Sequence, residues 1–192
     1  MDKKTIGFAL CGSFCTFSKA IKQIEFLNEQ NLNIIPIMSY NAYSTDTRFG
    51  KAEDFISKIE NITGNKIIST IKEAEPIGPK NLLDALIIEP CTGNTLAKLA
   101  NGIADTPVTL SAKSHLRNSK PVIIAVSTND ALSMAAKNIG MLMNYRNIYF
   151  VPMSQDDYIG KPRSVVAHFE KTYDTLLSAM ENRQIQPIYA TR

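Results

Sequence analysis

Several residue types are scarce in this chain of 192 residues, and each scarcity excludes a class of site. Three cysteines, at positions 11, 15 and 91, are too few and too uneven for a disulfide framework, and they indicate a reducing compartment. His115 and His168 are the only histidines, and neither lies at a recognised metal-ligand spacing from the cysteines. We therefore expect no metal site, and we interpret Cys11 and Cys15 as core thiols.

Excess charge and long apolar runs are also lacking. The net charge is only +3 and the basic residues are scattered, so the sequence shows no nucleic-acid footprint. No stretch approaches the roughly 18 apolar residues of a membrane span. Lys3 and Lys4 precede apolar residues 6–11, but this run is too short for a signal peptide. We expect a soluble, cytoplasmic protein.

Short apolar runs alternate with helical periods along the chain. The runs at 5–10, 33–38, 85–88, 122–126 and 148–151 predict buried parallel strands. Apolar residues at helical spacing predict helices around 17–27, 55–62 and 96–103, with further helices at 130–143 and 164–180. The fold class is α/β, a three-layer doubly wound parallel sheet of Rossmann-like type. Residues 1–192 are expected to form a single domain.

The most informative stretch is 89–105, where a strand is followed by a helix. Pro90 is expected to end the strand, and Thr92, Asn94 and Thr95 place hydroxyl and amide groups beside the first N–H groups of the helix. Such a corner suits an anion or a polar heterocycle. The alternative is that Thr92 is only a helix N-cap.

Three other strand ends carry short polar side chains. Gly12 and Ser13 follow the first strand, where a glycine is also common for steric reasons alone. After the second strand, the loop 45–48 brings Arg48, which either binds a carboxylate or pairs with Asp46 or Glu53. Ser127 to Asp130 follow the fourth strand, and Asp130 is interpreted either as a helix cap or as part of a ligand site.

The segment Pro90 to Thr95 resembles the Pro-Ala-Ser-Ala-Asn-Thr signature of the homo-oligomeric flavin-containing cysteine decarboxylase superfamily. The resemblance extends over roughly residues 5–155, and it implies that the chain binds FMN. The residues that it implies for the cofactor are Gly12, Ser13, Phe14, Ser39, Thr92, Asn94, Ser127 and Thr128. Ser39 is the position expected at the flavin phosphate, and Arg48 and Asn94 are the residues expected at the substrate.

Segments 45–50, 71–79, 90–105, 147–152 and 155–157 are similar to one branch, the family of dipicolinate synthase B subunits. That resemblance implies a role in forming pyridine-2,6-dicarboxylate from a tetrahydrodipicolinate precursor in the mother cell of a sporulating bacterium. It also implies a partner A subunit that brings NAD(P). A trimeric or dodecameric homo-oligomer is expected by analogy, and Phe14, Phe17 and Met134 either face its interface or belong to the core.

The chain also departs from the superfamily pattern. No histidine precedes position 115, whereas the decarboxylases use one in this region, and the Met-rich substrate clamp is replaced by residues 127–130. The alternatives are therefore a flavin-free structural subunit, or a stand-alone FMN-dependent decarboxylase or prenyltransferase. His115 and Arg117 are expected at the end of a helix, favourable to its dipole. His168 is expected on the late helix, with Ser164 as that helix's N-cap.

Overall fold

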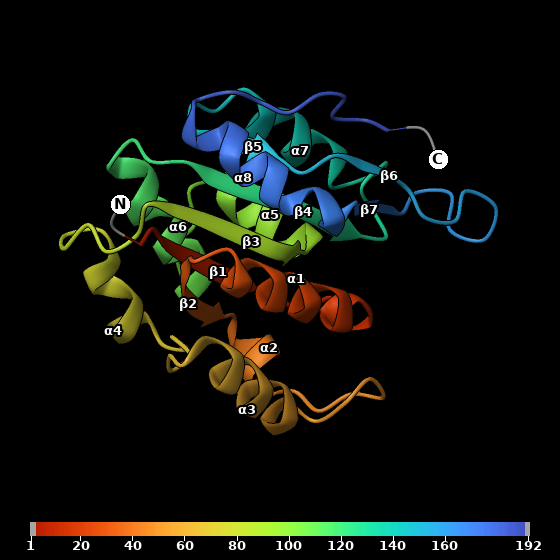
Figure 1. Cartoon of the computed structure of the whole chain (residues 1–192). Coiled ribbons are helices and arrows are strands. Elements are labelled where there is room, and N and C mark those ends of the chain that lie inside the picture. Colours follow the sequence, from red (N-terminus) through yellow and green to blue (C-terminus); the bar gives the residue numbers. More distant parts are fainter. Residues whose placement is uncertain (1–2, 191–192) are drawn as a thin grey trace.

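The computed structural model describes residues 3–190 (Figure 1). Its strands are β1 (Thr5–Leu10), β2 (Asn33–Met38), β3 (Ala85–Cys91), β4 (Val122–Thr128), β5 (Ile148–Phe150), β6 (Met153–Gln155) and β7 (Val165–Ala167). Its α-helices are α1 (Phe17–Glu29), α2 (Tyr40–Ser44), α3 (Ala52–Thr63), α4 (Ile71–Ala74), α5 (Gly93–Ala100), α6 (Pro107–Arg117), α7 (Ala136–Met143) and α8 (Thr172–Met180). Short 3-10 helices lie at Phe14–Thr16, Glu75–Ile77 and Phe169–Lys171.

Five strands form a parallel sheet in the order β2-β1-β3-β4-β5, and β7 and β6 continue from the far end of β4 in antiparallel pairing. The predicted α/β fold is confirmed. The runs predicted for β1 and β2 match the observed strands at both ends. Both strands are covered on their faces, so their residues are apolar almost without interruption.

Helices cover both faces of the sheet, with α1 and α8 on one side and α5, α6 and α7 on the other, while α2 and α3 lie beside the β2 edge (Figure 1). The core between these layers is filled by large side chains such as Phe8, Phe17 and Phe150, all nearly inaccessible to solvent. Among residues 3–190, no helix is long and apolar enough to cross a bilayer.

The structure corrects the predicted end of the third strand. Pro90 does not end β3, which runs on to Cys91. A register shift between Ile88 and Cys91 accommodates the proline, which has no N–H for the ladder, while its carbonyl accepts a hydrogen bond from the Cys11 N–H at 3.2 Å. The first and third strands therefore stay joined up to the point where the polar corner begins.

The C-terminal third differs more from the prediction. β4 includes Ser127 and Thr128, because these residues pair with β7. Helix α7 begins only at Ala136, so Asp130 caps no helix and instead closes a turn, its carbonyl accepting the N–H groups of Ser133 and Ala135. Residues 165–167 form β7 rather than a helix, α8 starts at Thr172, and Ser164 is not its N-cap.

Candidate functional site

Three strand ends meet at one edge of the sheet. In the order β2-β1-β3-β4, the direction of the chain connections reverses between β1 and β3, and ligands of open α/β sheets bind in the crevice at such a point. The residues after these strands are Gly12 and Ser13 after β1 and Thr92 after β3, with Ser127 and Thr128 at the end of β4. The sequence-predicted corners therefore converge on a single site.

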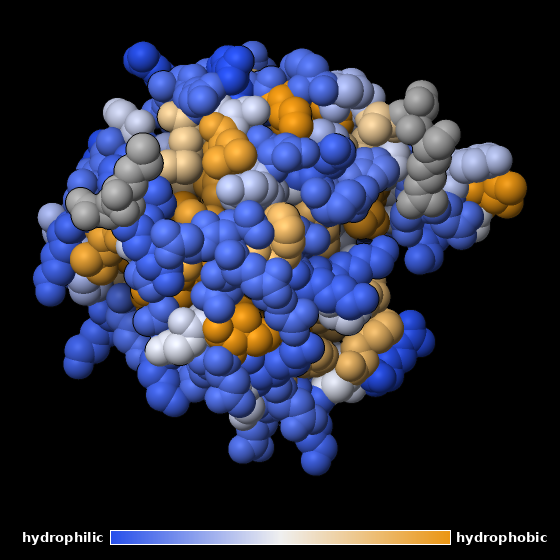
Figure 2. Space-filling model, in the orientation of Figure 1, coloured by the Kyte–Doolittle hydropathy of each residue, from blue (hydrophilic) through white to orange (hydrophobic). Residues whose placement is uncertain are grey.

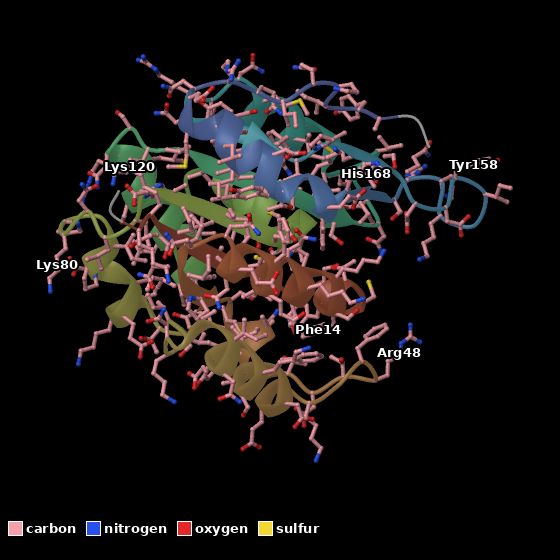
Figure 3. All side chains as sticks on the ribbon, viewed as in Figure 1. Phe14, Arg48, Lys80, Lys120, Tyr158 and His168 are labelled. Carbon is pink, nitrogen blue, oxygen red and sulfur yellow. The ribbon has the colours of Figure 1, made fainter. Side chains whose placement is uncertain are left out.

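A cavity of about 1110 Å³ opens at this edge. It is lined by Gly12, Ser13, Phe14, Cys15, Thr16, Lys19, Phe49, Thr92, Gly93, Asn94, Ser127, Thr128, Asn129, Asp130, Asp156, Lys161, Pro162, Arg163, Ser164 and Val166. In Figure 3, Tyr158 lies at the tip of a loop that projects from the right edge, and Arg48 lies on the loop below it. The molecular outline is indented between these two loops in Figure 2.

Hydroxyl groups from two distant corners form the floor of this cavity. The Ser13 hydroxyl lies 2.9 Å from that of Ser127, and the Thr16 hydroxyl donates to the Ser13 carbonyl at 2.8 Å. Thr16 also lies 3.4 Å from the Ser127 hydroxyl. This cluster holds β1 and β4 together across the cavity and presents donors and acceptors to it.

The start of α5 forms a second wall. Thr92 is its N-cap, because its side chain accepts the Thr95 N–H at 3.4 Å, as the simpler interpretation predicted. Helix geometry leaves the first N–H groups of α5 without intrahelical partners. Asn94 follows on the exposed surface of this turn, and its side-chain amide makes no hydrogen bond to any described residue. Both features are available to a ligand.

Gly93 is packed tightly against the opposite corner. A Cβ there would lie 2.7 Å from Asp130 Oδ1 and 2.9 Å from Thr128 Oγ1, and these two atoms are joined by a hydrogen bond of 2.5 Å donated by Thr128. At Gly12, by contrast, a Cβ would meet its nearest neighbour at 3.5 Å. Close approach of two corners therefore requires glycine at position 93, but not at position 12.

A second cavity, of about 320 Å³, shares Gly12, Thr92 and Asn94 with the large one. The rest of its lining is polar or small: Cys11, Ser39, Tyr40, Asn41, Thr95, Lys98 and Thr106. The Ser39 hydroxyl caps α2 by accepting the Ala42 N–H at 3.3 Å. Ser39 is thus separated from Ser13 and Ser127, and the predicted cofactor residues divide between two adjoining cavities.

Two buried thiols lie beneath these cavities. Burial raises the pKa of Cys11 to about 11, although the Thr95 hydroxyl donates to its sulfur at 3.2 Å. Burial and the neighbouring Cys11 raise the pKa of Cys91 well above its usual value. Both thiols are therefore protonated and unreactive at neutral pH. Cys15, interpreted from the sequence as a core thiol, is exposed. No cluster of metal-ligating side chains occurs in the part of the chain described here.

A buried carboxyl group was not singled out from the sequence. Glu89 on β3 is fully buried, the Thr172 hydroxyl donates to its Oε2 at 2.5 Å, and no described group bonds its Oε1. Burial raises the pKa of Glu89 well above its usual value, so the fold favours the protonated, neutral form of this group. The sequence did contain a sign of this residue, because an acidic residue at the end of an apolar strand is unusual. The proline that follows Glu89 suggested instead that the strand had already ended.

The structure places one predicted side chain outside the site and decides between the two alternatives for two others. Arg48 is exposed and is not among the lining residues; its guanidinium stacks on Phe49, 4.9 Å from the ring centroid, and forms no ion pair with Asp46 or Glu53. Phe17 belongs to the core and is unavailable to an interface, whereas Met134 is 69% exposed.

The two histidines also differ from expectation. His115 lies in the last turn of α6 as predicted, but burial lowers its pKa to about 4, so it carries no charge at neutral pH to favour the helix dipole. His168 follows β7 instead of lying on a helix, and it is half-buried.

Sequence reasoning missed four of the five charged residues of the large cavity, all but Asp130. Lys19 comes from the outer surface of α1, and Asp156, Lys161 and Arg163 come from the loop between β6 and β7. The helical periodicity places Lys19 on a solvent-facing side of α1. The loop that carries the other three residues is positioned by β6 and β7, which are only three residues long. Only the packed structure brings these groups to the strand ends.

The lining fits a flavin mononucleotide. Phe14 and Phe49 offer aromatic surface for a ring system, and the hydroxyls of Ser13 and Ser127 and the Asn94 amide can hydrogen-bond its polar edge. The smaller cavity adds hydroxyl and amide donors for a phosphate, while its lysine, Lys98, is paired with Asp105 at 2.8 Å. The large cavity, at about 1110 Å³, is at the upper end of the ~300–1000 Å³ typical of a small-ligand pocket.

Comparison with known proteins gives the same family from sequence and structure. Residues 1–181 match the Flavoprotein family. The chain is 44% identical to the dipicolinate synthase B subunit of Bacillus subtilis (strain 168) over 185 residues, 96% of this chain and 92% of the relative. It superposes on the crystal structure of the dipicolinate synthase B subunit from Bacillus halodurans C with a TM-score of 0.90, at 42% identity, covering 98% and 97% of the two chains.

A more distant structure shares the fold. The FMN-dependent cysteine decarboxylase SpaF is 24% identical and superposes with a TM-score of 0.65, covering 92% of this chain and 97% of that chain.

Proposed function

The chain belongs to the flavoprotein family and is a homologue of the dipicolinate synthase B subunit, and from this premise we propose that it is the flavin-binding subunit of a two-subunit dipicolinate synthase. The enzyme forms pyridine-2,6-dicarboxylate from a hydroxylated tetrahydrodipicolinate by loss of one water and removal of two electrons and two protons. A partner A subunit with NAD(P) completes the complex, which acts in the cytoplasm of the sporulating mother cell.

The observation that carries the proposal is the position of Asn94. This exposed amide stands between the two cavities and has no hydrogen-bond partner among the described residues, next to the free N–H groups at the start of α5. Because the Asn94 amide lines both cavities and makes no internal hydrogen bond, it can bond a polar ligand in either cavity without breaking one. A flavin, when bound, supplies a two-electron acceptor.

The chain's residues then have separate tasks. Ser39 and the polar lining of the smaller cavity hold the phosphate, with Gly12 and Thr92 between the two cavities. Ser13, Ser127 and Thr128 hydrogen-bond the polar edge of the ring, and Phe14 covers its apolar part. Asn94 orients ring and substrate together. Arg48, which lies outside the lining, has no part in this assignment.

A stand-alone decarboxylase is less well supported. The sequence has no histidine before position 115, and the two that exist lie outside the lining of the large cavity. The relatives that carry that activity in their names share the fold with this chain at low identity. We also propose that the chain assembles as a homo-oligomer and that residues 1–192 form one domain, with exposed Met134 near the interface.

The test is the visible absorbance of the purified chain titrated with FMN, for the wild type and Asn94→Ala. We expect a flavin spectrum in the wild type and binding weakened about tenfold or more in the variant, which loses hydrogen bonds to a buried polar ring. Asn101→Ala, at the C-terminal end of the same helix and outside both cavities, is the matched control and should bind FMN as the wild type does.

The second half of the test is dipicolinate formation with and without the A subunit and a nicotinamide cofactor. Product formed only in the mixture, with activity reduced in Asn94→Ala, supports the proposal. Full activity of the mixture while the wild-type chain binds no FMN would instead show that the chain is a flavin-free structural subunit.

A further inference from the structure

Five charged residues line the large cavity, and two of its three cations lack an ionic partner. Lys161 lies 3.8 Å from Asp156, so these two charges compensate each other. Asp130 accepts the Thr128 hydroxyl. The remaining two, Lys19 and Arg163, form no ion pair with any residue between 3 and 190. The cavity therefore holds two cations that are available to an anionic ligand.

These two charges come from different elements. Lys19 lies on α1, three residues beyond Thr16 of the hydroxyl cluster. Arg163 lies on the loop between β6 and β7, where the chain is held on both sides. Its carbonyl accepts the Leu132 N–H at 3.0 Å, and the Pro162 carbonyl accepts the Gln155 amide at 2.8 Å. A loop fixed in this way loses little freedom when its arginine binds a ligand.

One acidic group of the lining, Asp130, restricts where an anion can lie. Asp130 packs against Gly93 at the start of α5, so a carboxylate placed there would be repelled. A ligand carboxylate is therefore favoured near Lys19 and Arg163. A guanidinium binds a carboxylate through two parallel hydrogen bonds, and an ammonium adds a compact second charge.

We propose that Lys19 and Arg163 bind the two carboxylates of a small planar dicarboxylic acid of the pyridine-2,6-dicarboxylate class, one carboxylate to each side chain, in the large cavity. The choice of this ligand class rests on the proposed function. Lys98, the cation of the smaller cavity, is paired with Asp105 at 2.8 Å, so the flavin phosphate is assigned to the hydroxyl and amide donors of that cavity and to neither Lys19 nor Arg163. Arg48, the cation expected from the sequence, is replaced in this role by Arg163.

The chain provides matched controls for both residues. Lys22 lies on the same helix as Lys19 and is also exposed; both line a neighbouring cavity of about 350 Å³, but only Lys19 lines the large one. Arg48 is an exposed arginine outside the lining. Loss of either control charge changes the net charge of the protein as much as loss of Lys19 or Arg163.

The experiment is calorimetric titration of the full chain, with and without FMN, using pyridine-2,6-dicarboxylate and pyridine-2-carboxylate. The proteins are the wild type, Lys19→Gln, Arg163→Gln, Lys22→Gln and Arg48→Gln, each checked for an unchanged melting temperature. Lys19→Gln and Arg163→Gln should each bind the dicarboxylate about tenfold more weakly or worse. The two controls should stay within about twofold of the wild type.

The monocarboxylate makes the test specific. The wild type should prefer the dicarboxylate clearly, and each cavity variant, having one cation left, should bind both acids with similar affinity. An undiminished preference in Lys19→Gln and Arg163→Gln, equal losses in the controls, or no binding of the dicarboxylate by the wild type would each overturn the proposal.

A parallel FMN titration separates this inference from the proposed function. If the wild type fails to bind FMN while the dicarboxylate results are as expected, the flavin role is wrong and the carboxylate site stands. If Lys19→Gln loses FMN but keeps the dicarboxylate, Lys19 serves the flavin phosphate and the carboxylate assignment is overturned.

Discussion

The hydroxyl groups of Ser13 and Ser127 lie 2.9 Å apart, although 114 positions separate them in the sequence. The first follows β1 and the second belongs to the end of β4. β3 lies between these strands in the sheet, so the contact passes over the end of β3, where Thr92 and Gly93 begin the next corner. The hydrogen bond therefore sets the width of the cavity floor.

The first prediction concerns this hydrogen bond. Ser13→Ala and Ser127→Ala should each lower the free energy of unfolding by about 1 kcal/mol, because each removes the 2.9 Å bond and leaves the other hydroxyl only its longer contact to Thr16. The double variant should lose less than the sum, since the bond is already broken in either single variant. Urea unfolding measures the coupling. As a control, the stability losses of Ser13→Ala and the exposed Ser44→Ala should add in the double variant. If the losses of Ser13→Ala and Ser127→Ala also added, a direct bond between these two residues would be contradicted.

The two glycines at the cavity should respond differently to alanine. In Gly93→Ala the added Cβ meets Asp130 Oδ1 at 2.7 Å, so the corner must shift, at a cost of about 1–3 kcal/mol. Gly12→Ala has its nearest neighbour at 3.5 Å and should fold with nearly unchanged stability. Thermal unfolding and FMN titration compare the two. Equal melting temperatures would show that the two corners are free to separate at Gly93.

The sequence predicted the elements that have a strong local pattern. β1 and β2 are continuous apolar runs in a covered sheet, so their ends were readable residue by residue. The convergence of Gly12, Thr92 and Ser127 also followed, because parallel strands end at the same edge of a sheet. By contrast, β6 and β7 contain three residues each, too few for a period, and the valines of β7 resembled the start of a helix.

The charged residues that line the large cavity could not be predicted either, and the reason is different. Whether an exposed lysine on α1 faces a cavity depends on how the helix packs in the finished fold, which no local pattern contains. In the sequence, Arg48 looked like the better candidate for a substrate-binding cation because it lies in a polar loop. In the structure, that loop places its guanidinium over Phe49. Arg163 had no signal, since the position of its segment depends on hydrogen bonds from Leu132 and Gln155, which lie outside that segment.

The buried Glu89 predicts a stability loss with rising pH. The unfolded chain releases this proton near pH 4.5, whereas the folded chain keeps it to much higher pH, so the free energy of unfolding falls as pH rises above about 4.5. Glu89→Gln keeps an acceptor for the Thr172 hydroxyl and has no proton to lose. Its stability relative to the wild type should increase between pH 4.5 and 8. Denaturant unfolding across this range measures it, with exposed Glu29→Gln controlling for the loss of one carboxylate.

His115 predicts the opposite slope at lower pH. Its side chain is buried in the last turn of α6 with Nε2 unbonded by any described group, and burial, aided by Lys120, lowers its pKa from 6.5 to about 4. Between pH 6.5 and pH 4, His115 is protonated in the unfolded chain but stays neutral in the folded chain. The stability that neutral His115 provides above pH 6.5 is therefore lost as pH falls, by about 3 kcal/mol on reaching pH 4.

His115→Asn removes the ionising ring and should lose less stability than the wild type between pH 7 and 4 in denaturant unfolding. The ring proton resonances of the wild type provide a direct check, since the chain has only two histidines and the variant assigns them. The His115 resonance should titrate with a midpoint near pH 4, and a midpoint near 6.5 would mean that water reaches this ring. In that case the variant and the wild type should also lose stability in parallel, because the folded and unfolded chains would then bind the proton equally well.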